Sequence, residues 1–137
     1  MPTLLAIVSR SMHSYAAPVL YSVDLGQCEA LAALRPDEIS ATFVAALGRA
    51  GATILHELTH VFPGAGLTSV LILSESHAAL HTWPETGSVH IDIFSCSSRL
   101  KSLEAVDELS RSFGAGRISI QEVRRADGHC PQPDPIR

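Results

Sequence analysis

Four apolar segments in the middle of the chain are joined by very short links, and this spacing is what most restricts the fold. The segments cover residues 52–62, 67–73, 78–82 and 88–95. The last of them alternates β-branched with polar or aromatic residues, as a strand with one buried face does. A parallel connection needs about a dozen residues or more, so the short links predict antiparallel neighbours.

Two segments with helical periodicity accompany these strands. The first begins at Pro36, has acidic residues in its first turn and ends at Gly51. The second places apolar residues three or four apart and is closed by glycines, with Leu100, Leu103, Val106, Leu109 and Phe113 as its stripe and Gly114 and Gly116 after it. Further strands are predicted over 19–25 and 118–123, while 1–17 and 128–137 show no regular pattern. The chain of 137 residues is therefore predicted to form one domain over 1–137. Its fold class is α+β: a two-layer α/β sandwich, an antiparallel sheet with helices on one face.

Charge and cysteine content narrow the possible partners. The net charge is −4, and no basic cluster exceeds Arg124 and Arg125, so neither nucleic acid nor an anionic membrane is an expected partner.

No apolar run reaches the ~20 residues of a membrane span. The start of the chain has no basic region before its apolar residues, which argues against a signal peptide. Three cysteines without a CxxC pair favour a reducing, cytoplasmic location over a disulfide framework.

The segment His56-Glu57-Leu58-Thr59-His60 matches the zinc-protease motif HExxH. In that motif both histidines share one face of a helix, and the glutamate activates a metal-bound water. Here the segment is rich in β-branched residues and is confined between Gly51 and Pro63, which favours a strand. We therefore predict no zinc site at this motif.

A second metal candidate combines His77 with His81, and with His90 on a later segment. On a strand, His77 and His81 share a face but lie roughly 13 Å apart at ~3.3 Å per residue. One ion does not bridge that distance without a bend. The sequence therefore predicts no metal in this region either.

The most specific stretch runs from Leu73 to Glu85 and is followed by the segment 91–96. It contains Ser-Glu-Ser-His, then His-Thr-Trp-Pro-Glu, and then a cysteine at the end of the next strand. These motifs and their spacing resemble the signature of the small prokaryotic, pyruvoyl-dependent S-adenosylmethionine decarboxylase proenzymes. The resemblance extends more weakly from Val19 to Val123.

The resemblance implies a self-cleaving enzyme. The cut falls between Glu75 and Ser76, giving a β chain of residues 1–75 and an α chain of residues 76–137. Ser76 becomes the covalent pyruvoyl cofactor, a form of pyruvate that binds the substrate amine as a Schiff base. His81 is the base that removes the α-proton of Ser76 during processing, and Thr68 supplies a supporting hydroxyl. Cys96 is the proton donor in decarboxylation.

Substrate and partner also follow from the resemblance. The implied substrate is S-adenosylmethionine, a small molecule whose decarboxylated product serves polyamine (spermidine) synthesis. Phe62 takes the place of a ring that stacks on adenine, and Glu85 that of a carboxylate that binds the ribose. Small relatives are homodimers of cleaved protomers, so a second copy of the chain is the expected partner.

Departures from the family pattern leave the substrate open. Residues 18–21 replace a Gly-x-His-Leu pattern, Thr86 replaces an aromatic residue, and Ser97 replaces a glycine. Two alternatives remain: the same chemistry on a basic amino acid, L-ornithine or L-arginine, and a non-catalytic relative that serves as a binding module.

One geometric difficulty concerns the processing pair. Ser76 and His81 are separated by an odd number of residues, so a regular strand would place their side chains on opposite faces. We therefore expect the chain to bend or break between them, and cleavage at Ser76 would free that end to move.

Overall fold

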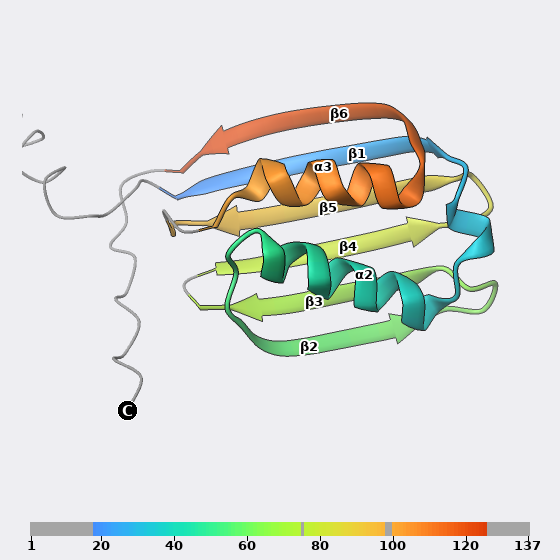
Figure 1. Cartoon of the computed structure of the whole chain (residues 1–137), viewed down its shortest axis with the longest axis horizontal. Helices are drawn as coiled ribbons and strands as arrows, with labels where there is room; N and C mark the ends of the chain where they lie inside the picture. The colour runs from blue at the N-terminus through green and yellow to red at the C-terminus, as the bar shows by residue number, and fades with distance from the viewer. Residues whose placement is uncertain (1–17, 75, 98–99, 126–137) are drawn as a thin grey trace, which may run out of the picture.

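The computed structural model describes residues 18–74, 76–97 and 100–125 as one antiparallel sheet covered by two helices (Figure 1). The sheet has six strands in the order β2-β3-β4-β5-β1-β6. In chain order the elements are β1 (Val19–Cys28), the short 3-10 helix η1 (Leu31–Ala33), α2 (Pro36–Arg49), β2 (Ile54–Val61), β3 (Leu67–Leu73), β4 (Ser76–Trp83), β5 (Ser88–Ser95), α3 (Ser102–Phe113) and β6 (Ala115–Arg124). The predicted α+β class with an antiparallel sheet is confirmed.

Strands β2 to β5 form a meander, and β1 closes the sheet between β5 and β6. The central strand β4 pairs with β5 along its whole length and with β3 from Ser76 to Thr82. It is longer than the predicted segment 78–82, because this pairing satisfies the backbone groups of Ser76 and His77 as well. The predictions for residues 1–17 and 128–137 fall outside the described residues.

Both helices lie on one face of the sheet, as Figure 1 shows. Helix α2 contacts β2 and β3, whereas α3 contacts β1 and β6. Alternate strand residues point toward the helices and form one continuous core with them, including Leu25, Leu71, Leu80, Ile91, Phe43, Leu47, Leu109 and Phe113. Burial of each such side chain stabilises the fold by about 1.5–3 kcal/mol relative to an exposed position. The opposite face of the sheet, which we call the open face, is covered by no described element.

Helix ends follow the signals in the sequence, with one exception. The backbone N–H of Arg35 donates to Glu38 Oε2 at 2.8 Å, which caps the start of α2. Helix α3 ends at Gly114, whose φ of 66° suits a residue without a Cβ. The expectation that Gly116 also closes this helix is wrong, because β6 already begins at Ala115. A Cβ at Gly116 would lie 2.8 Å from Gln27 Oε1, so close packing between β1 and β6 accounts for this glycine.

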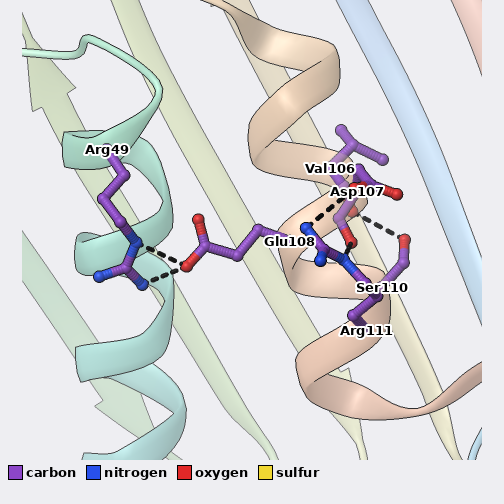
Figure 2. A network of polar contacts seen from close by, with 6 residues as sticks. All are labelled: Arg49, Val106, Asp107, Glu108, Ser110 and Arg111. Carbon is purple, nitrogen blue, oxygen red and sulfur yellow. Dashed lines mark hydrogen bonds and ion pairs between the residues drawn. The ribbon is translucent and has the colours of Figure 1, made fainter.

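An ion pair joins the exposed sides of the two helices (Figure 2). Arg49 Nε on α2 donates to Glu108 Oε1 on α3 at 2.7 Å, and the Arg49 Nη2 group bonds the same oxygen. The hydrogen bond from Arg49 holds the pKa of Glu108 below its usual value. Further along α3, Arg111 pairs with Asp107 at 3.0 Å.

Among residues 18–74, 76–97 and 100–125, no helix has the length and hydropathy needed to cross a membrane.

The lowered pKa of Glu108 predicts a pH-dependent contribution to stability. The contribution is present above the carboxyl's unfolded pKa and is lost as the pH falls through its lower folded pKa. Glu108→Gln should therefore lower the urea midpoint of unfolding at pH 7, and the difference from the wild type should vanish in acid, once the pH lies below the lowered pKa of the folded carboxyl group. Glu104→Gln on the same helix is the control that leaves the ion pair intact. A difference that persists unchanged in acid would contradict this assignment.

Candidate active site

The open face carries histidines on three of its strands, β2, β4 and β5. The pairing register and the alternation of side chains along each strand place five histidines on this face. They are His56 and His60 on β2, His77 and His81 on β4, and His90 on β5. The HExxH segment is thus a strand, as predicted, and does not provide the helical face that a zinc protease needs. Across the described part of the chain, no three His, Cys, Asp or Glu side chains gather closely enough to hold a metal ion.

Thr68 and His81 form a hydrogen-bonded pair on this face. They are Cα partners on β3 and β4, and Thr68 Oγ1 lies 2.9 Å from His81 Nδ1. A base at Nε2 requires Nδ1–H to donate to the threonine oxygen, because a neutral imidazole has one donor and one acceptor nitrogen. In that tautomer the threonine oxygen accepts from Nδ1–H and orients the ring, and its own hydroxyl hydrogen remains available to another acceptor.

Trp83 and His90 extend this site toward β1. The Trp83 ring lies 5.9 Å from the ring of His81 and 4.5 Å from that of His90. His90 Nε2 is 3.8 Å from Asp24 Oδ1 on the next strand. The sequence analysis assigned no role to Trp83 or Asp24, and the pairing of β4, β5 and β1 is what brings Trp83 and Asp24 beside His90.

Ser76 lies at the other end of β4 and on the other face. Its Cα partners are Leu73 on β3 and Ser95 on β5, and it shares the helix-facing side with Ala78 and Leu80. Its hydroxyl donates to the carbonyl oxygen of Ser74 at a long 3.4 Å. Glu75, the residue before the predicted cut, lies outside the described residues.

The structure therefore does not bring Ser76 and His81 of one chain together. Five residues of strand separate them by about 16 Å at ~3.3 Å per residue, and their side chains lie on opposite faces. Their odd separation along the strand places the two side chains on opposite faces, as predicted. The expected bend or break between them is absent, because β4 runs unbroken from Ser76 to Trp83 with partners on both sides.

The other predicted site residues divide between the same two ends of the sheet. Phe62 follows β2 and is 47% exposed, with its ring 4.6 Å from that of His60, and exposed Glu85 lies in the turn after β4. Both are thus at the end that holds Thr68 and His81. Cys96, 5% exposed, directly follows Ser95 and so belongs to the end that holds Ser76.

The two described cysteines differ in state. Cys28 is a free thiol in the core, and burial raises its pKa. Cys96 is disulfide-bonded in this structure, in contrast to the expectation of a chain without disulfides. A disulfide sulfur carries no proton, so Cys96 serves as a proton donor only in its reduced form.

Comparisons with known proteins identify a family for this arrangement. The sequence profile of the family described as S-adenosylmethionine decarboxylase matches residues 20–126. The S-adenosylmethionine decarboxylase proenzyme of Acidithiobacillus ferrooxidans is 33% identical over 102 residues, which are 74% of this chain and 77% of that one. The proenzyme of the same name from Methanococcus maripaludis is 32% identical over 103 residues, 75% of this chain and 84% of that one.

A solved structure has the same fold. The crystal structure of the adenosylmethionine decarboxylase from Aquifex aeolicus superposes with a TM-score of 0.71. The match covers 87% of this chain and 98% of the other, at 23% sequence identity. The sheet and its two helices are thus an arrangement that this chain shares with a known decarboxylase.

The Thr68–His81 bond predicts a fixed tautomer for this imidazole. Thr68→Val removes the oxygen that faces Nδ1, so the two ring nitrogens of His81 should become more nearly equivalent in ¹⁵N spectra of the histidine-labelled protein. His77 is the control on the same strand and face, and its signals should not move. Unchanged His81 signals in the variant would show that the hydrogen bond does not select the tautomer.

Proposed function

Because the chain belongs to the S-adenosylmethionine decarboxylase family, we propose that it is a proenzyme that cuts itself before Ser76 and then decarboxylates S-adenosylmethionine. The observation that carries the proposal is the hydrogen-bonded Thr68–His81 pair, which has the base and the hydroxyl that the family's processing step requires. The family profile extends over this pair, over Ser76 and over Cys96.

Self-cleavage begins with attack by Ser76 Oγ on the carbonyl carbon of the preceding residue. A carbon–oxygen ester bond forms, the carbon–nitrogen bond breaks, and the hydroxyl hydrogen ends on the freed amine. A base then removes the α-hydrogen of Ser76, and the residue 75 carboxylate leaves. The dehydroalanine that remains reacts with water, loses ammonia and becomes a pyruvoyl group. His81 Nε2 is the proposed base for the α-hydrogen, with Thr68 holding its ring.

The pyruvoyl ketone supplies an electron sink for the loss of carbon dioxide from a bound amine. The residues at its end of the sheet fit such a group, because Ser76 starts a strand and Cys96 ends the neighbouring segment with a small, nearly buried side chain. In its reduced form, the Cys96 thiol is the proposed donor of the proton that replaces the lost carboxylate.

We further propose that the working enzyme is a homodimer that uses its open face as the interface. The separation of Ser76 from His81 requires the base to come from elsewhere, and a second copy supplies it. Large apolar side chains lie unpartnered on this face, with Leu58 74%, Ile72 45% and Trp83 38% exposed. A two-fold arrangement of two open faces would place the Thr68–His81 end of one copy over the Ser76 end of the other. There the imidazole would approach the α-carbon of Ser76 from the side opposite its hydroxyl group, as a base for the α-hydrogen must.

The first prediction from this proposal concerns the mass of the chain. The purified wild-type protein should give two fragments that separate between Glu75 and Ser76, the second starting with a carbonyl-reactive pyruvoyl group. Ser76→Ala should stay intact because no hydroxyl remains. His81→Ala should slow cleavage by about 10²–10⁴-fold, the usual effect of losing a general base. Denaturing mass spectrometry of the wild type and the two variants measures the fraction of chain that is cut in each.

His56→Ala is the matched control, since it removes an open-face histidine on β2 that has no place in the mechanism. An intact wild-type mass without carbonyl reactivity would refute self-cleavage and favour a binding module. For the cleaved, reduced protein, carbon dioxide release is compared for S-adenosylmethionine, L-ornithine and L-arginine. The proposal requires S-adenosylmethionine to be the preferred substrate, and preference for either amino acid would overturn that part of it.

The second prediction tests whether the base acts across the interface. Ser76→Ala keeps His81, and His81→Ala keeps Ser76. When the two variants are co-expressed with different tags and isolated as mixed dimers, the His81→Ala chain should be cut and the Ser76→Ala chain should not. Replacing the first variant by Ser76→Ala/His81→Ala is the control and should abolish the cut. Cleavage in the wild type but never in mixed dimers would place the base within the same chain.

A further inference from the structure

Ser95 is the polar neighbour of Ser76 on the helix-facing side of the sheet. The two serines are Cα partners on β5 and β4, and Ser95 is only 9% exposed. The other partner of Ser76 is Leu73, which has no polar side-chain group. The Thr68–His81 pair lies on the opposite face, so it does not approach the Ser76 hydroxyl of its own chain.

The hydrogen bonds at this end of the sheet hold Ser95 more firmly than Ser76. The backbone N–H of Ser97 donates to Ser95 Oγ at 3.0 Å, which fixes that oxygen and leaves its hydrogen and a lone pair for another group. Among the described residues, the bond that Ser76 Oγ makes is the long 3.4 Å one to Ser74. Side chains that face each other in an antiparallel pair have Cβ atoms about 4.5–5.5 Å apart, a distance that two hydroxyl groups span by rotating about χ1.

We propose that Ser95 is a catalytic residue of the first step of self-cleavage, in which the peptide bond before Ser76 becomes an ester. This inference rests on the proposed cleavage at Ser76. The Ser95 hydroxyl bonds Ser76 Oγ, turns it away from Ser74 and holds it for attack on the preceding carbonyl carbon. The Ser76 hydroxyl hydrogen passes to the departing amide nitrogen, and Ser95 relays it by accepting one hydrogen and donating its own. No proton is gained or lost overall.

This assignment separates the two steps by face and by residue. Ester formation uses Ser95 of the same chain on the helix-facing side, whereas removal of the α-hydrogen uses His81. Loss of Ser95 should therefore prevent the ester from forming, and loss of His81 should let the ester accumulate. A residue that only stabilised the fold would affect both steps alike.

The experiment measures the ester directly in the His81→Ala background. Hydroxylamine cleaves an ester but spares the peptide bond, so the fraction of chain cut by hydroxylamine reports the first step. Ser95→Thr and Ser95→Val have nearly the same shape and differ in the hydroxyl. The threonine variant should form the ester as Ser95 does, and the valine variant should form it about tenfold more slowly, as the loss of one well-placed hydrogen bond predicts.

Thr82→Val is the matched control, because Thr82 is also buried on the helix-facing side of β4 and its hydroxyl accepts the Leu67 N–H at 3.1 Å. It should leave the ester fraction unchanged. Equal ester formation in the Ser95→Thr and Ser95→Val proteins would overturn the proposal. If a thermal unfolding measurement shows that the Ser95→Val protein is not folded, Ser95→Ala takes its place in the comparison. Absence of both ester and fragments in every protein, wild type included, would instead refute the proposed self-cleavage.

Discussion

The pairing of β4 on both of its edges is the constraint on which the site depends. Because β3 and β5 hold this strand in register from Ser76 to Trp83, its side chains alternate without interruption between the core and the open face. Ser76 is thereby fixed at one end beside Ser95, and His81 at the other beside Thr68. A bend that joined the two ends would break backbone hydrogen bonds in the middle of the sheet, and each unpaired buried group would cost about 1–3 kcal/mol.

The division of chemistry between two faces follows from that pairing. On the helix-facing side Ser76 is half-buried, and both of its Cα partners, Leu73 and Ser95, are buried. The open face holds the imidazoles and is exposed to water in the single chain. In the proposed dimer, a second copy would exclude this water and strengthen the polar interactions of the Thr68–His81 pair. The same contact would bury the apolar side chains that a single chain leaves exposed, so assembly would also complete the proposed site.

The sequence predicted the fold better than the site. Short links and alternating residues, such as Val89, Ile91 and Ile93, are local signals, and they were sufficient for an antiparallel sheet with two helices. The family resemblance gave Thr68 a supporting role, but its contact with His81 depends on the register of β3 and β4, which the sequence does not show. Ser95 carried no signal of its own: a serine before a cysteine is unremarkable until β5 places it opposite Ser76. The disulfide state of Cys96 likewise does not follow from the number of cysteines in the sequence, which is three.

Two departures from the family pattern illustrate how this chain preserves the geometry that it needs. Ser97 stands where the family has a glycine, yet the group that fixes Ser95 is the backbone N–H of Ser97, which either residue provides. Thr86 replaces an aromatic residue in the turn after β4, and its hydroxyl bonds the Trp83 carbonyl oxygen at 3.3 Å and Ser88 Oγ at 3.1 Å. The turn is therefore held by polar contacts, which preserves the placement of Trp83 beside His81. What changes is the surface near Glu85, where Thr86 is exposed. Neither departure falls on Ser76, His81 or Thr68, the residues of the proposed cleavage, so that proposal does not depend on them.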